Sequence, residues 1–261
     1  MRVIALDRDL IVFVSRIWQT TCSALRWSGE AFLVDSPVLP DELEALPSVL
    51  EQSDFAVSAL LVTHADWDHL LARYAFPGSS LGCPESSARR IAAEPGAAQR
   101  ELRQFDEQHY LERQGTLGLG GIQPLPVPGK LELGDAAHEL ELHPAEGHTG
   151  DGAAYWVPWL KVLICGDYLS PVEIPSISDG GSLEGYLATL ERLAPLVEQA
   201  RAVVPGHGAP LEPAGALRII AEDLAYLNSL AADAAGARAP ASRASSAQRR
   251  IHEANLARIR A

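Results

Sequence analysis

The sequence predicts an α/β protein in which two β-sheets pack face to face and helices cover their outer faces. Two observations support this prediction. The 261 residues are 47% hydrophobic and 21% charged, which is enough apolar material to bury a sizeable core. Along the chain, a block of strand-like segments is followed by helical segments, and this order then repeats. Layered packing is the arrangement that buries the apolar side of each block.

The first half of the chain contains the first block of strands and the first helices. Polar turn residues such as Ser28 and Gly29 separate short apolar segments, a pattern typical of strands. The expected strands comprise residues 2–5, 11–15, 22–26, 31–35 and 59–62. Helices are expected at residues 40–52, where Pro47 should interrupt, and at 86–94 and 97–109. Residues 115–128 are rich in Gly and Pro, so we expect a loop there.

The second half repeats the order of strands and helices. The expected strands comprise residues 130–133, 139–143, 153–157, 161–164 and 202–204. Ser182 is the expected N-cap of an amphipathic helix over residues 183–197, and another helix is expected at 213–230. The chain then becomes rich in Ala, Gly, Ser and Arg. It therefore divides into a domain, residues 1–230, and a tail, residues 231–261, made of a linker and a short C-terminal helix.

The composition argues against several classes of protein. A net charge of −13 is unfavourable for a nucleic-acid binder, and the chain lacks the run of about 18 apolar residues that a membrane-spanning helix needs. Charged residues among the first 18 positions interrupt the apolar region of a secretory signal. Three cysteines, Cys22, Cys83 and Cys165, form an odd and sparse set, so we expect reduced thiols. These features predict a cytoplasmic protein.

Four side chains that can bind metals directly follow the expected buried strand at residues 59–62. They are His64, Asp66, Asp68 and His69. Alternation along an extended segment points the first three to one side, and a turn into a helix would bring the fourth round. A solvated turn is the alternative interpretation of such a cluster, but a metal site is the one we favour.

Three further candidates are flanked by glycine, and each lies near the end of an expected strand. They are His148 in Gly-His-Thr, Asp167 in Cys-Gly-Asp and His207 in Pro-Gly-His-Gly. Small neighbours allow the backbone to approach a metal. Each of these residues, taken singly, is more often a capping, core or turn residue. Together with the first cluster they indicate a metal centre.

The cluster at residues 64–69, followed in order by His148, Asp167 and His207, resembles the metal-binding pattern of the metallo-β-lactamase superfamily. Its pattern is H-x-H-x-D-H after a strand, then a His, a bridging Asp and a last His. The resemblance covers about residues 1–230. It implies a four-layer αββα sandwich of two mixed β-sheets, with the site between the sheets at the strand ends. Asp35 matches the family's early structural aspartate.

The resemblance also implies a ligand set for two divalent metal ions. The first ion would be held by His64, Asp66 and His148, the second by Asp68, His69 and His207, and Asp167 would bridge them. Zinc is the expected metal, with iron or manganese as alternatives. A metal-bound His usually has a hydrogen-bond partner for its other ring nitrogen. Thr149 and Tyr168 are candidates for that role, although packing is the better interpretation of Tyr168.

Asp66 stands where the family usually has a second His. As an ionised ligand it would neutralise a site that otherwise keeps a net positive charge, and it would therefore raise the pKa of bound water. Carboxylate-rich ligation also suits iron or manganese better than an all-imidazole site does. The alternative is that Asp66 holds a water or an Arg. The sequence alone predicts that Asp66→His strengthens zinc binding.

The function that the resemblance implies is metal-dependent hydrolysis of an ester, thioester or lactone of a small molecule. A hydroxide bridging the metals would attack, and Asp68 would orient it. The glyoxalase II and lactonase branches are the most similar in pattern, because Pro-Gly-His-Gly precedes long helices. Two alternatives remain open. One is an iron-dependent oxidoreductase of the same fold, and the other is a non-catalytic metal-binding module.

Specificity and the role of the tail are less directly encoded. Residues 115–128 and 170–181 are the expected specificity loops. In the tail, Ile251, Leu256 and Ile259 form an apolar face interrupted by Asn255. This pattern predicts weak packing or contact with a second copy in a homodimer, and a tail that the metal site does not need.

Overall fold

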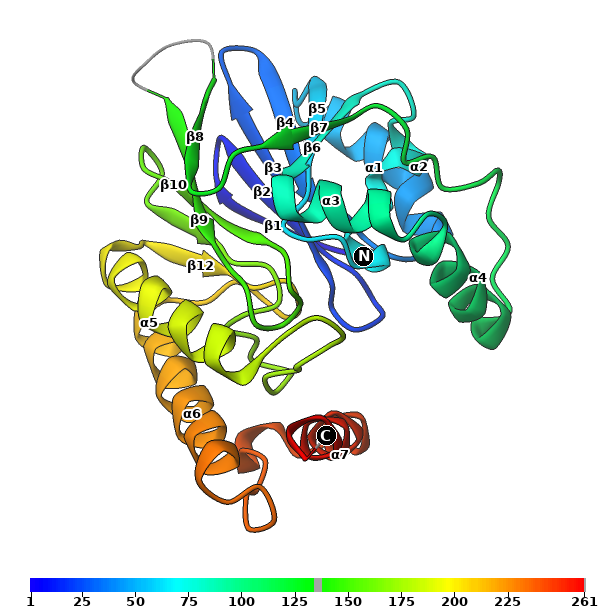
Figure 1. Ribbon diagram of the computed structural model, residues 1–261. Coiled ribbons are helices and arrows are strands. Elements are labelled where there is room, and N and C mark those ends of the chain that lie inside the picture. Colours follow the sequence, from blue (N-terminus) through cyan, green and yellow to red (C-terminus); the bar gives the residue numbers. More distant parts are fainter. Residues whose placement is uncertain (134–137, 261) are drawn as a thin grey trace.

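Two β-sheets pack face to face, and helices cover the outer face of each (Figure 1). The computed structural model describes residues 1–133 and 138–260. Both sheets contain parallel and antiparallel strand pairs, which confirms the predicted sandwich of two mixed sheets. No helix within these described ranges is long and apolar enough to cross a membrane.

The first sheet has seven strands in sequence order. They are β1 (Arg2–Asp7), β2 (Leu10–Val14), β3 (Thr21–Trp27), β4 (Glu30–Asp35), β5 (Val57–Leu61), β6 (Ser80–Pro84) and β7 (Ile122–Leu125). The pairs from β1 to β4 are antiparallel, and those from β4 to β7 are parallel. Its helical elements are α1 (Pro40–Gln52), the 3₁₀ turn η1 (Trp67–His69), α2 (Ala72–Ala75), α3 (Glu85–Ala93) and α4 (Ala97–His109).

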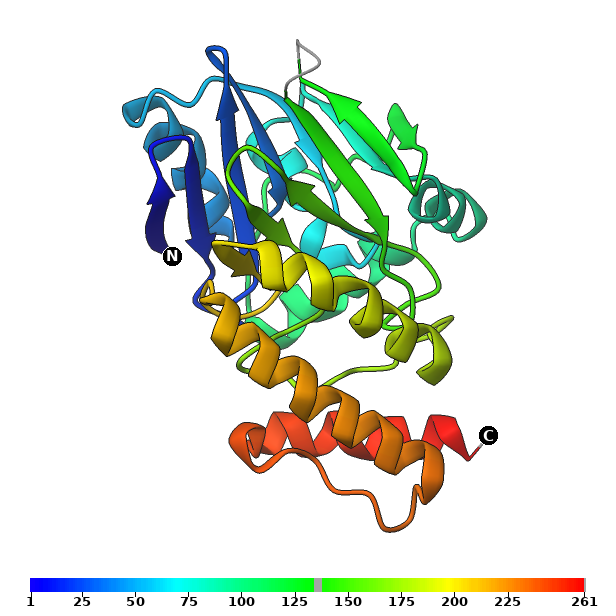
Figure 2. The same ribbon diagram turned by 90° about the vertical axis from the view of Figure 1, so that its left-hand side faces the viewer.

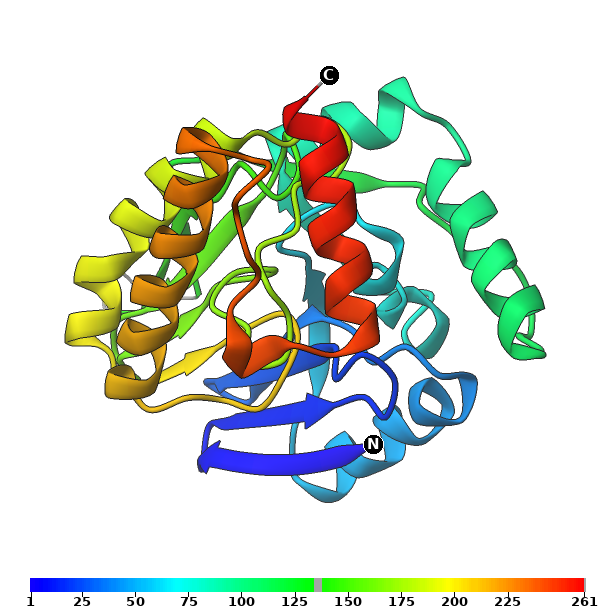
Figure 3. The ribbon, with the colours of Figure 1, turned by 90° about the horizontal axis from the view of Figure 1, so that it is seen from below.

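The second sheet has five strands in the order β12-β11-β10-β9-β8. They are β8 (Gly129–Glu132), β9 (Glu139–Pro144), β10 (Ala153–Val157), β11 (Val162–Ile164) and β12 (Ala202–Val204). Helices α5 (Leu183–Gln199) and α6 (Pro213–Ala232) run side by side over its outer face (Figure 2). The chain ends with the 3₁₀ turn η2 (Ala241–Arg243) and α7 (Ser246–Ile259), which crosses one end of the sandwich (Figure 3).

Strand β2 shows how the layers are held together, because all five of its residues are buried. Leu10, Val12 and Val14 face the core between the two sheets. Ile11 and Phe13 face the opposite way, into the core beneath α1 and α4. Alternate side chains of a strand point to opposite faces, so an uninterrupted apolar run is what a strand covered on both sides requires.

Two expectations about local structure were wrong, and one strand was not expected at all. Pro47 lies inside an unbroken α1, where its half-buried ring sits beside a surface pocket. The expected loop at residues 115–128 contains β7, whose Ile122 pairs with Leu81 of β6. Strand β6 itself had no expected counterpart, because its sequence contains Gly82 and ends in Pro84, two residues that are uncommon in strands.

The expectation of a weakly packed tail was also wrong. Two polar residues of α7, Gln248 and Asn255, are 4% and 1% exposed. Ile251, Leu256 and Ile259 pack against the core that α5 and α6 form with the second sheet. The short C-terminal helix is therefore present and buried on one side. The division into a domain and a tail stays a prediction.

Candidate metal centre

The predicted cluster follows the end of β5 and faces the connections of the second sheet. After Leu61 the chain bends at residues 63–65, is extended at Asp66, and then turns into η1, which contains Asp68 and His69. The expected turn into a helical segment is present, but the expected extended segment is not, because Asp68 already lies within η1. His64, Asp68 and His69 are all buried, with 4%, 7% and 0% of their surfaces exposed.

The other candidates come from three connections of the second sheet. His148 lies between β9 and β10, Asp167 follows β11, and His207 follows β12. Gly206 lies so close to Asp167 that a Cβ on it would clash with the carboxylate. The glycine beside His207 therefore lets two loops approach each other, whereas the sequence had suggested a close approach of the backbone to a metal.

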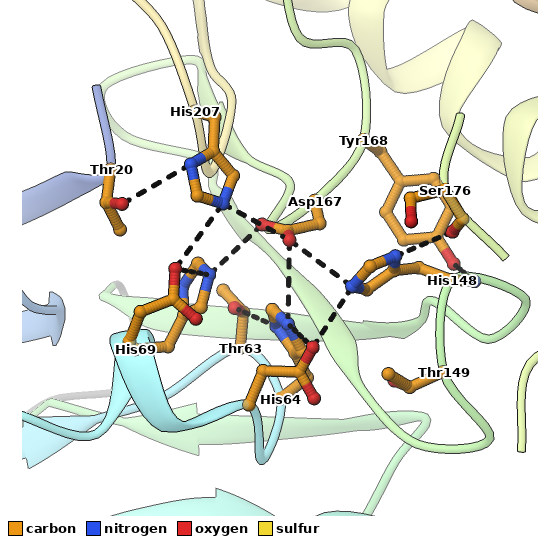
Figure 4. Close-up of polar contacts among 12 residues, drawn as sticks. Thr20, Thr63, His64, His69, His148, Thr149, Asp167, Tyr168, Ser176 and His207 are labelled. Atoms are coloured by element: carbon orange, nitrogen blue, oxygen red, sulfur yellow. Dashed lines mark hydrogen bonds and ion pairs between the residues drawn. The ribbon is translucent and has the colours of Figure 1, made fainter. Parts of the chain in front are cut away.

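The four histidines turn their Nε2 atoms toward the carboxylate of Asp167 (Figure 4). Its Oδ2 lies 3.3 Å from Nε2 of His148, 3.3 Å from that of His207 and 3.8 Å from that of His64. Its Oδ1 lies 3.1 Å from Nε2 of His69. Asp167 thus stands between two pairs of imidazoles, as a bridging ligand would.

The potential ligand atoms form two groups. In one, His64, His148 and Asp167 place their atoms within 4.8 Å of one another, and in the other Asp68, His69 and His207 do so. The Nε2 atoms of His64 and His69 are buried and have no hydrogen-bond partner among the described residues. Buried polar atoms normally have partners. Imidazole nitrogens and carboxylates suit zinc and related ions, so this donor set fits the two implied metals.

The other ring nitrogen of each imidazole lies close to an oxygen atom of the protein. Nδ1 of His64 lies 3.0 Å from Thr63 Oγ1, and Nδ1 of His69 lies 3.0 Å from Asp35 Oδ2. Asp35 is buried and also accepts a 2.8 Å hydrogen bond from the Thr63 backbone N–H. This geometry is consistent with the structural role that the resemblance implies for Asp35.

The remaining two imidazoles have backbone partners in loops, and Nδ1 of His207 also lies 3.3 Å from the Thr20 hydroxyl (Figure 4). Nδ1 of His148 lies 2.7 Å from the carbonyl oxygen of Ser176, and Nδ1 of His207 lies 3.1 Å from that of Trp18. Neither predicted partner takes the His148 ring. Tyr168 Oη accepts a hydrogen bond from the His148 backbone, and the Thr149 hydroxyl donates to the backbone carbonyl of Asp151. Backbone partners leave no trace in the sequence, so residue type could not reveal them.

Asp66 has one oxygen toward the site and one toward a cation. Its Oδ2 lies 3.2 Å from Nε2 of His148 and 3.6 Å from that of His64. Its Oδ1 accepts a 2.7 Å hydrogen bond from Arg90 Nη1. The two interpretations of Asp66, a metal ligand or a partner of Arg, are therefore compatible with one conformation.

Arg90 is a site residue that the sequence analysis missed. It extends from α3 and also donates a 2.9 Å hydrogen bond to Asp151. Asp151 is buried and accepts further hydrogen bonds from the Ala65 N–H and the Ser87 hydroxyl. Arg90 stands in an ordinary amphipathic helix, and only the fold brings it to Asp66.

Without a metal, the acids and imidazoles stabilise one another's charges. Burial alone would lower the pKa of His148, but the hydrogen bond to Asp66 and the charge of Asp167 raise it to about 9. Burial likewise opposes protonation of His207, yet the charges of Asp167 and Glu173 raise its pKa to about 10. Burial favours the neutral form of Asp167, but the neighbouring histidines hold its pKa well below 3.8. Protonated histidines therefore neutralise the buried carboxylates when no metal ion is bound.

An aromatic cluster borders the centre on the side of the first sheet. The Trp18 ring lies 5.6 Å from that of Trp67 and 5.0 Å from that of Phe105. Trp67 is nearly buried, whereas 43% of Trp18 is exposed. The backbone carbonyl of Trp18 lies 3.1 Å from Nδ1 of His207, so the residue that carries this indole also contacts a candidate ligand.

Comparisons with known proteins identify the family and the fold. The sequence profile of the Metallo-beta-lactamase superfamily matches residues 16–207, a span that includes all seven predicted ligands. A metallo-beta-lactamase family protein from Thermus thermophilus is 24% identical, with a TM-score of 0.67 over 89% of this chain and 85% of its own.

Two further solved structures are similar in fold. The metallo-beta-lactamase from Pontibacter korlensis is 17% identical, with a TM-score of 0.64 over 87% of this chain and 98% of its own. The DIM-1 metallo-beta-lactamase, in a structure exposed to ceftazidime, is 17% identical, with a TM-score of 0.60 over 84% and 94% of the two chains. At these identities the similarity establishes the fold.

Proposed function

Since the chain belongs to the metallo-beta-lactamase superfamily, we propose that it is a metal-dependent hydrolase that cleaves an ester, thioester or lactone of a small molecule. The observation that carries the proposal is the position of Asp167 between two groups of ligand atoms. Two divalent ions held there would polarise the attacked carbonyl group and lower the pKa of a bound water to near neutrality.

The residues of the chain divide the remaining work. His64, His148 and Asp66 would hold one ion, His69, His207 and Asp68 would hold the other, and Asp167 would contact both. Asp68 Oδ2 lies 3.6 Å from Nε2 of His207 and 3.8 Å from that of His69. We assign to the Asp68 carboxylate the orientation of the attacking water and the acceptance of its proton.

The surroundings favour a substrate with an apolar part. The exposed face of Trp18 offers a surface for an acyl chain or ring beside the centre. The Arg90 guanidinium is already engaged by Asp66 and Asp151, so it is not available to bind a substrate carboxylate. These contacts, together with Pro-Gly-His-Gly before α6, support a glyoxalase II-like or lactonase-like substrate class.

Asp66 supports a second candidate, an iron-dependent oxidoreductase. A third carboxylate at the centre suits a harder ion than zinc. Anaerobic reduction of natively purified protein distinguishes the two functions. An iron centre would change its absorption spectrum, whereas zinc would stay silent.

A panel of aryl esters, thioesters and lactones tests the hydrolase directly. We expect zinc-loaded protein to cleave at least one class and the metal-stripped protein to cleave none. His148→Asn and Asp68→Asn should each lower kcat by about a hundredfold or more. His143→Asn is the matched control, because His143 lies on β9 outside the centre and its loss should leave kcat unchanged. Equal rates in wild type, H148N and D68N would contradict the proposal.

A further inference from the structure

Helix α7 lies along the loop that connects β11 to α5. Gln248 Oε1 accepts a 2.7 Å hydrogen bond from the N–H of Ile174. Farther along the same helix, Asn255 Oδ1 accepts a 2.9 Å hydrogen bond from the N–H of Ile177, and Nδ2 donates a 2.7 Å bond to the carbonyl of Pro175. The loop beneath α7 is therefore fixed by side chains at several of its residues.

The hydrogen bonds from Asn255 to Pro175 and Ile177 lie on either side of a residue that contacts a candidate ligand. Ser176 lies between Pro175 and Ile177, and its carbonyl oxygen lies 2.7 Å from Nδ1 of His148. A His that binds a metal through Nε2 donates its Nδ1–H to such an acceptor, which fixes the tautomer and the direction of the ring. The chain of contacts thus runs from Asn255 through the loop backbone to the His148 ring.

The environment of Asn255 shows that its amide is used fully. The residue is 1% exposed, and Nδ2 also donates to Tyr226 Oη at 3.1 Å. Asn is a poor helix former, and a buried amide is costly unless its hydrogen bonds are satisfied. A leucine would suit an apolar helix face better if contact with α6 were the only requirement. The amide is instead matched to the backbone groups on either side of Ser176.

We propose that Asn255 is a positioning residue for the metal group that contains His148. It fixes the Ser176 carbonyl and, through it, the direction in which His148 presents Nε2. The inference rests on the proposed function, because the direction of the imidazole matters only if His148 binds a metal ion. It also reverses the expectation that the metal site does not need the tail.

Three variants separate positioning from simple stability. Asn255→Ala removes all the hydrogen bonds of the side-chain amide. Asn255→Leu removes them too but keeps most of the side-chain volume. Leu256→Ala is the control, since Leu256 is the next residue of α7 and packs against the core. We expect all three to unfold at lower temperature than the wild type. Only the Asn255 variants should alter His148.

The first readout needs no metal. In metal-free wild-type protein, the ring ¹H–¹⁵N spectrum should show a slowly exchanging Nδ1–H of His148, assigned by its loss in His148→Asn. That signal should be lost, or exchange rapidly with water, in both Asn255 variants and persist in Leu256→Ala. A signal that is absent from the wild type, or unchanged in a folded Asn255→Leu, would overturn the positioning role.

The second readout is zinc affinity, measured by chelator competition. One of the two dissociation constants should rise about tenfold or more in the Asn255 variants, while the other stays at its wild-type value. Equal weakening of both, with the same result in Leu256→Ala, would show a merely structural role. Wild-type protein that retains the ring signal but binds no zinc would instead overturn the proposed function and leave the contact between the loop and His148 intact.

Discussion

Arg90 Nη1 lies 2.7 Å from Asp66 Oδ1, while the other oxygen of the same carboxylate faces His64 and His148. The pair brings a cation to the position where the sequence resemblance implies a histidine and this chain has an aspartate. Arg90 offsets the negative charge that Asp66 adds in place of an imidazole. It also fixes the direction of the carboxylate through a charged hydrogen bond, and its second carboxylate partner, Asp151, holds the guanidinium in place.

Replacing Asp66 with the histidine that the resemblance implies should therefore not strengthen zinc binding on its own. Asp66→His would set an imidazole against the Arg90 guanidinium and leave Asp151 as the only acid paired with it. We expect zinc affinity to fall in this single variant and to recover when Arg90→Met is added. Chelator competition across the four proteins of the double-mutant cycle measures the coupling, which should reach about 1 kcal/mol or more. Additive effects would show that the two residues act independently.

Metal-free protein should lose stability as the pH rises. The pKa values of His148 and His207 are about 9 and about 10 in the folded protein, against an ordinary value of 6.5. Their contribution is complete below pH 6.5 and is lost as the pH rises toward about 10. Asp167, whose pKa is lowered, contributes above pH 3.8 and loses that contribution in acid.

Thermal unfolding from pH 4 to pH 10 checks this expectation. The Tm of chelated protein should be highest between about pH 4 and pH 6.5 and should decline on the alkaline side. Saturating zinc should remove the alkaline decline, because the metal replaces the protons and binds only the folded state. A metal-free Tm that increases steadily up to pH 10 would contradict the charge arrangement described for the centre.

Asp35 should matter to the metal group that contains His69. It has a φ of +62° and lies 3.0 Å from Nδ1 of that imidazole. Asn tolerates this left-handed conformation, so Asp35→Asn removes the charge with little strain. We expect one zinc dissociation constant to rise about ten- to a hundredfold. Asp54→Asn is the control, since Asp54 has a φ of +60° on the exposed surface. Equal effects of the two variants would point to backbone strain rather than to His69.

The three cysteines should not react with a thiol reagent in the native protein. Cys22, Cys83 and Cys165 are free and buried, which confirms the expectation of no disulfide among them. Burial, together with the charge of Asp151, raises the pKa of the Cys83 thiol to about 12, so thiolate is scarce. A thiol reagent should find no reactive cysteine in native protein and three in denatured, unreduced protein. Rapid native reaction would show that the core opens.

The sequence predicted most of the fold because apolar patterning was strong. Helix α4 and strands β10 and β12 lie at the residues expected for them. Strand β7 was missed because its residues, Ile-Gln-Pro-Leu, lie in a stretch whose Gly and Pro content indicates a loop. It forms by pairing with β6, a tertiary contact that local pattern does not contain.

The candidate ligands were predictable because they also form a local sequence pattern. The residues that orient them were not predictable. Four of the metal-competent residues follow one strand and three stand beside glycine near strand ends, and the fold brings all seven together. Arg90 and Asn255 lie far from that pattern along the chain and reach it only through α3 and α7. The polar Asn255 looked like a break in an apolar face because its partners are backbone groups of another segment.

The metal content of the protein tests the central claim most directly. Protein stripped with chelator, incubated with zinc and freed of excess should retain two ions per chain by elemental mass spectrometry. His148→Asn should retain one, because the group containing His69 is intact, and His143→Asn should retain two. A folded wild-type protein that retains one zinc ion or none after loading would contradict the assignment of the seven residues to a dinuclear centre.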